Sequence, residues 1–133
     1  MPPEEAKRAI KRVKLDDIME ILSKQKGWPK TRADEAEQWY RNFLWLSYLF
    51  GDEPVYAIYR DSDDVWHAHM VYTERYREFV VPVFGRFLNH TPISGQINYT
   101  YVQRFQRSLD GYQAEFAKSP LGVPLSAFVS QCY

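Results

Sequence analysis

Apolar and aromatic side chains recur three or four residues apart along most of this chain, and this spacing restricts the fold more than any other feature. Side chains at this spacing share one face of an α-helix, and the clearest examples span residues 36–50 and 99–116. Residues 55–59 are rich in β-forming types, but the stretch is short and isolated, so we expect a buried connector. The sequence therefore predicts an all-α protein, a compact bundle of four to five helices.

Turn-forming and helix-capping residues divide this pattern into elements. We expect a first helix or helix pair that ends before Gly27 and Pro29, then a core helix over residues 32–50 with Thr31 as its N-cap. Asp61 or Ser62 is predicted to cap the next helix, which should run to about residue 81. Pro82 would clash with the carbonyl four residues earlier, so we predict a break or a kink there. Residues 99–116 are predicted to form the last helix, and residues 119–133 an irregular tail.

Length and charge exclude several classes of protein. A chain of 133 residues with 45% hydrophobic content is expected to form a single helical domain over residues 1–133. Seventeen basic residues balance seventeen acidic ones, so nothing in the overall charge favours nucleic acid as a partner. The basic residues within 1–14 are read as the solvated face of a peripheral helix rather than as a nucleic-acid arm. No apolar run is long enough for a signal peptide or a membrane span, and we expect a cytoplasmic protein.

Cysteine usage removes two further kinds of site. Cys132 is the only cysteine, which excludes an intramolecular disulfide and a zinc site built from several cysteines. It could be a reactive thiol, but no adjoining basic residue would lower its pKa, so an inert tail residue is favoured.

Chemistry is concentrated in the middle of the chain, where all three histidines lie. His67 and His69 are two positions apart, which separates them by about 200° around a helix, so both could reach one metal only if the helix were distorted or the segment extended. Asp63 and His67 are four positions apart and share a helical face, on which Glu74 and Glu78 also fall near His67. His69 instead turns toward the expected core, so it is the less favoured ligand.

Three interpretations of this pattern remain open. His90 could return from beyond Pro82 and complete an Asp63, His67 and His90 site for iron or zinc, the site of a metal-binding protein or of a small metalloenzyme. Alternatively, Asp63 orients His67 as a catalytic general base without a metal. In the third interpretation, Asp63 pairs with His67 on the surface, His69 is a hydrogen-bonded core residue and His90 sits in a turn. The protein would then be a non-catalytic interaction module.

A longer motif combines these residues. Asp63, Trp66-His67-Ala68, Thr73, Tyr76 and the run Phe84-Gly85-Arg86-Phe87-Leu88 before His90 and Pro92 resemble the glycine-rich domain-containing protein-like family. About thirty residues carry the resemblance, and the small bacterial members are the most similar. Bacterial members often have a bulky apolar residue in place of His69 and a second histidine in place of Asn89.

The resemblance implies a compact helical domain in which Asp63, Trp66, His67 and His90 belong to one site. Thr73, Tyr76 and Arg86 are expected to shape the pocket around it, together with Trp66. The family has no settled activity, and its plant members carry a glycine-rich tail that this chain lacks. The expected partner is a small molecule or another protein or peptide, with neither nucleic acid nor a membrane involved.

Overall fold

The computed structural model describes residues 1–90 and 98–120, and the described chain is entirely helical or irregular, without strands. The predicted all-α class is confirmed. The predicted number of helices is too small, because these residues form six: α1 (Pro3–Arg12), α2 (Asp16–Lys26), α3 (Lys30–Phe50), α4 (Arg60–Val71), α5 (Thr73–Phe84) and α6 (Tyr99–Phe116).

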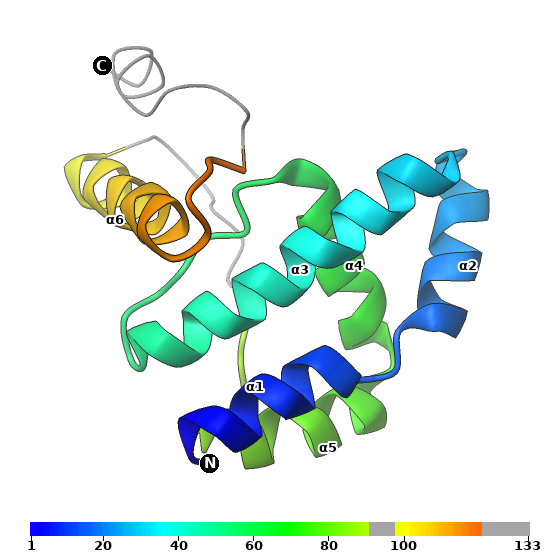
Figure 1. The fold of residues 1–133 in the computed structure, drawn as a ribbon, viewed down its shortest axis with the longest axis horizontal. Helices are drawn as coiled ribbons and strands as arrows, with labels where there is room; N and C mark the ends of the chain where they lie inside the picture. Colours follow the sequence, from blue (N-terminus) through cyan, green and yellow to red (C-terminus); the bar gives the residue numbers. More distant parts are fainter. Residues whose placement is uncertain (91–97, 121–133) are drawn as a thin grey trace.

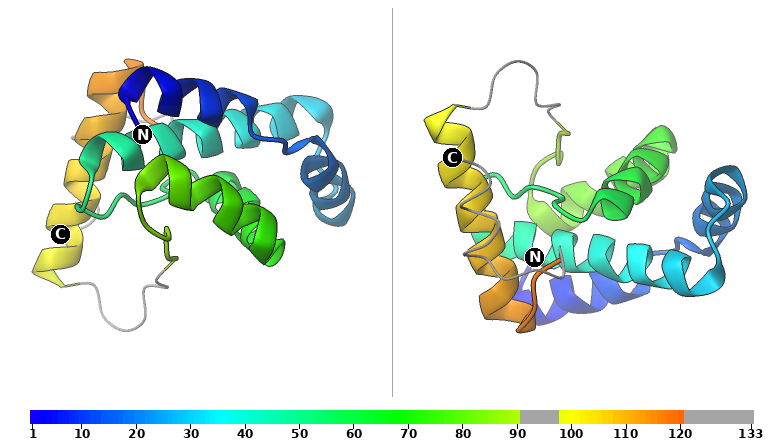
Figure 2. Two further views of the ribbon diagram at one scale, coloured as in Figure 1. Left: turned by 90° about the horizontal axis from the view of Figure 1, so that it is seen from below. Right: turned by 90° about the horizontal axis from the view of Figure 1, so that it is seen from above.

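The long helix α3 is the centre of the molecule and packs against α1, α2, α4 and α6 (Figure 1). It can serve four neighbours because its buried residues lie on several faces: Ala33, Ala36, Trp39, Tyr40, Asn42, Phe43, Leu44, Leu46 and Ser47. It begins at Lys30, with Pro29 in the N-cap position, so Thr31 lies inside the helix and is not its cap. α6 crosses α3 near one end and α2 packs near the other (Figure 2).

The basic helix α1 is anchored to α3 rather than detached from it. Ala6 and Ile10 are buried, while the Arg41 guanidinium of α3 donates hydrogen bonds to the carbonyls of Ile10, Lys11 and Val13 at 2.6–3.2 Å. These carbonyls lie at the end of α1, where the helix has no amide donors of its own left to offer. α1 is therefore a peripheral helix with a solvated basic face, held by its buried Ala6 and Ile10 and by the Arg41 guanidinium.

The segment predicted as one helix from Asp61 or Ser62 to residue 81 is two helices. α4 begins at Arg60 with Tyr59 in the N-cap position, and Tyr72 leaves the helical conformation (φ −85°, ψ 68°) before α5 starts. Pro82 does not break α5, which continues to Phe84 and ends at Gly85 in the left-handed conformation (φ 72°). Pro82 is exposed and close to the helix end, so the carbonyl that it deprives of a partner lies on the solvent face.

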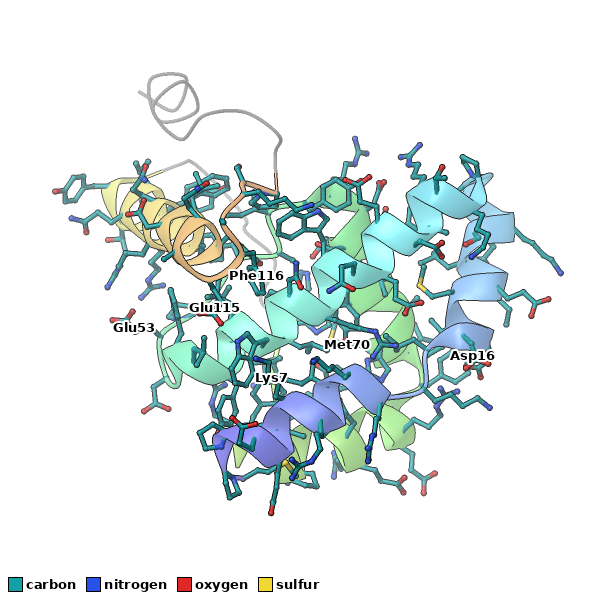
Figure 3. All side chains as sticks on the ribbon, viewed as in Figure 1. Lys7, Asp16, Glu53, Met70, Glu115 and Phe116 are labelled. Carbon is teal, nitrogen blue, oxygen red and sulfur yellow. The ribbon has the colours of Figure 1, made fainter. Side chains whose placement is uncertain are left out.

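The predicted last helix is confirmed as α6, which begins where the Asn98 side chain accepts a hydrogen bond from the Tyr101 amide at 2.9 Å. Leu109 and Tyr112 are buried against the bundle. Figure 3 shows Glu115 and Phe116 at the end of α6 that approaches α3, where Trp45 donates to the Glu115 carboxylate at 2.8 Å. Most of the predicted tail, including Cys132, lies outside the described residues.

Residues 55–59 are non-helical, with Val55 buried and the following residues half-buried, as expected for a connector. Within the described ranges, no helix has the length and apolar character needed to cross a bilayer.

Candidate metal centre

The three residues expected to converge do converge. Asp63 and His67 lie one turn apart on α4, and His90 returns to them from the irregular segment that follows α5. One potential ligand atom from each residue lies within 4.8 Å of the other two. Among the residues that the structure describes, these three form the one group of acidic and imidazole side chains with the geometry to hold a metal ion.

His90 is the centre of the cluster. Its Nε2 lies 2.8 Å from Asp63 Oδ1 and 2.9 Å from His67 Nε2, whereas His67 Nε2 is 3.8 Å from Asp63 Oδ2. The carboxylate therefore orients His90 more closely than His67, contrary to the metal-free interpretation in which Asp63 serves His67. An imidazole nitrogen carries either one proton or one lone pair in the ring plane. His90 Nε2 can therefore form a hydrogen bond with Asp63 or with His67, but not a good one with both. A cation between the three atoms would satisfy all of them.

A chain of hydrogen bonds behind the cluster determines where His90 lies. The Tyr76 hydroxyl accepts a hydrogen bond from Trp66 Nε1 at 2.8 Å and donates one to the Leu88 carbonyl at 2.6 Å. Burial raises the pKa of Tyr76 to about 12, so the hydroxyl keeps the proton that it donates. Because Leu88 is two residues before His90, this bridge fixes the returning segment against α4.

Ring packing completes the support. The Trp66 ring lies 4.4 Å from the His90 ring and 4.4 Å from the Phe43 ring of α3, measured between centroids. Trp66 is 6% exposed and therefore joins the cluster to the hydrophobic core. His67 has 53% of its side chain exposed and His90 16%, so the cluster opens outward on the His67 side.

His69 is separate from this site. It is 1% exposed, its Nδ1 shares a hydrogen bond of 2.6 Å with the Tyr40 hydroxyl, and its ring meets Tyr76 edge to face. Burial, with smaller contributions from Arg75 and Arg41, lowers the pKa of His69 to about 4, so the ring is neutral near pH 7. It is the hydrogen-bonded core residue that the helical wheel indicated.

The other predicted pocket residues occupy different positions. Thr73 is exposed at the start of α5, and Arg86 donates to the Gly51 carbonyl beside a separate hollow. Tyr76 acts from behind the site, as described above. Glu74 and Glu78 are exposed on α5, beyond the interruption at Tyr72, and do not belong to the group of possible ligands that includes His67.

The cluster forms one wall of a cleft of about 490 Å³ between α4, the connector and α6. Sequence reasoning missed most of its lining, because residues 55–59 were expected to form a buried connector and the aromatic stripe of α6 that includes Phe105 was favoured as core. The lining comprises Pro54, Val55, Tyr56, Ala57, Ile58, Asp63, Trp66, His67, Asn89, His90, Tyr101 and Phe105.

The family is now identifiable, because the model of the UCP032817-like family matches residues 6–108, which include the whole cluster. The chain belongs to the UCP032817-like family. This match overturns the resemblance to the glycine-rich domain-containing protein-like family, which rested on about thirty residues. The UCP032817-like family is uncharacterised. Neither curated proteins nor solved structures give a match to this chain.

Proposed function

We propose that this protein binds a divalent transition metal, zinc or iron(II), through Asp63, His67 and His90. The convergence of their three ligand atoms at the wall of an open cleft is the observation that carries the proposal. Two imidazoles and one carboxylate form a donor set suited to both ions.

The distances are compatible with an ion. Donor bonds of about 2.0–2.2 Å place neighbouring donors roughly 2.9–3.5 Å apart, depending on the coordination geometry. His90 Nε2 lies 2.8 Å from Asp63 Oδ1 and 2.9 Å from His67 Nε2, close to the lower end of this range. His67 Nε2 is 3.8 Å from the other carboxylate oxygen, Asp63 Oδ2, so small side-chain rotations would accommodate a metal. Three protein ligands leave coordination positions for water or a substrate on the cleft side. We therefore further propose that the bound ion is catalytic, as a Lewis acid or an activator of water.

Zinc titration of untagged protein, purified without chelators, tests the proposal. We expect one zinc ion per chain, and an unfolding free energy raised by about 2.7 kcal/mol when free zinc is 100 times its Kd. Asp63→Asn and His67→Ala should each weaken zinc binding at least about 100-fold, since they remove a ligand itself rather than a group supporting one.

Asp64→Asn is the matched control. Asp64 is adjacent to Asp63 but faces Lys26, with 3.7 Å between Oδ2 and Nζ, so its replacement should change zinc affinity less than about twofold. Absence of stoichiometric zinc, or equal weakening by Asp63→Asn and Asp64→Asn, would overturn the proposal. Because His67 is exposed, His67→Ala should retain the fold. If the variant instead lost stability in proportion to its loss of zinc binding, His67 would be a structural residue that braces the helices of an interaction module.

A further inference from the structure

The cleft beside the cluster has two chemically different parts. One part consists of Asp63, His67 and His90, with Trp66 packed against the His90 ring. The other part is a ring cluster, in which Tyr56 from the connector meets Tyr101 and Phe105 from α6. Pro54, Val55, Ala57 and Ile58 supply further apolar lining, and Asn89, next to His90 in the chain, adds a polar side chain. A ligand that fills the cleft must therefore have a polar end and an apolar body.

The ring cluster lines the cleft with aromatic surface. The Tyr56 and Tyr101 rings lie 5.4 Å apart with an interplanar angle of 24°, and Phe105 is 6.3 Å from Tyr56 and 5.9 Å from Tyr101. Aromatic side chains prefer ring partners in offset or edge-to-face arrangements, which a planar ligand ring can adopt and a puckered aliphatic ring cannot. The volume of about 490 Å³ lies within the range typical of small-molecule sites.

The charge at the polar end selects the head group. A divalent ion with one carboxylate and two neutral imidazoles leaves a net charge of one positive unit, which an anionic oxygen donor would neutralise. Such a donor suits the same metals, since zinc and iron(II) accept carboxylate oxygen beside histidine nitrogen.

We propose that the cleft binds an aromatic carboxylate, with its carboxylate oxygen on the metal and its ring against Tyr56, Tyr101 and Phe105. This inference rests on the metal site proposed above. It names the substrate class of that site and assigns specificity to the ring cluster that shares the cleft with it.

Benzoate and cyclohexanecarboxylate form the matched probe pair, because they share a head group and differ in the planarity of the ring. Their affinities for the full chain, loaded with zinc and checked by metal analysis, can be measured by ligand-observed NMR. We expect benzoate to bind about threefold to tenfold more tightly than cyclohexanecarboxylate, the range that aromatic contacts provide. Removing zinc with a chelator should weaken benzoate binding at least about tenfold.

Two variants locate the binding. Tyr101→Ala should weaken benzoate binding about threefold to tenfold while leaving zinc affinity within about twofold. Tyr99→Ala is the control, because Tyr99 is on the same helix, is 70% exposed and lies outside the cleft lining. Circular dichroism of both variants checks that α6 is retained.

The two proposals fail in different ways. If zinc binds but benzoate shows no preference over cyclohexanecarboxylate, or Tyr101→Ala and Tyr99→Ala behave alike, the aromatic-carboxylate assignment is overturned and the metal site stands. If wild-type protein binds no zinc, the metal site itself is wrong and the assignment falls with it.

Discussion

Acid should destabilise this protein through one buried imidazole, that of His69. Burial lowers the pKa of His69 from its ordinary value of 6.5 to about 4. Between these two pH values, His69 is protonated in the unfolded chain but remains neutral in the folded chain. The sign follows directly: the stabilisation is complete above pH 6.5, declines as pH falls and is lost below about pH 4. A difference of 2.5 pKa units corresponds to about 3 kcal/mol in total, of which about 2 kcal/mol should disappear between pH 7 and pH 5.

His69→Asn isolates this contribution, because the amide can still reach the Tyr40 hydroxyl but does not titrate. Urea unfolding followed by tryptophan fluorescence, at several pH values, gives the free energy of unfolding for both proteins. The carboxylates titrate in both proteins, so their contributions cancel in the difference between the two free energies of unfolding. The advantage of the wild type over His69→Asn should therefore shrink by about 2 kcal/mol from pH 7 to pH 5.

Tyr40→Phe is the matched control for the same buried pair. It removes the 2.6 Å hydrogen bond and should cost about 1–3 kcal/mol at pH 7, yet it retains the imidazole and hence most of the pH dependence. If the difference between wild type and His69→Asn were constant from pH 7 to pH 5, His69 would not be held neutral by burial, and the reasoning would be refuted.

Two other contacts give predictions of their own. Tyr76→Phe leaves Trp66 Nε1 and the Leu88 carbonyl without their shared partner, so we expect a loss of about 2 kcal/mol in urea unfolding and roughly tenfold weaker zinc binding; unchanged zinc affinity would show that the bridge does not position His90. Arg41→Met removes the guanidinium from three carbonyls at the end of α1, which should cost about 2 kcal/mol and speed amide hydrogen exchange in α1. Equal exchange rates in α1 of both proteins would contradict this anchoring role.

Helical spacing predicted the elements whose apolar pattern runs without interruption. α3 and α6 follow continuous apolar patterns, and their predicted positions agree with the structure within two residues. The interruption at Tyr72 escaped prediction because apolar residues on both sides of it face the same core, so the pattern in the sequence continues across the break. Because a single continuous helix was assumed, Glu74 and Glu78 were expected near His67, whereas they lie on the separate helix α5.

The part of the site that lies within one helix could be predicted from the sequence. Asp63 and His67 share a face because four residues nearly complete one helical turn. His90 was expected to return because of a break at Pro82, but the chain reverses at Gly85, where a left-handed conformation ends α5. The cleft could not be predicted, because the roles of Tyr101 and Phe105 depend on where the connector crosses α6, which no spacing within either segment encodes.

The Tyr76 hydroxyl bridge has a consequence for how quickly anything can bind beside it. Because Trp66 and Leu88 are already tied together through one oxygen, His90 reaches Asp63 without help from a ligand. A preorganised pocket of this kind loses little conformational entropy on association. The association rate of a ligand would then depend on diffusion and on displacement of solvent rather than on a slow rearrangement of the backbone.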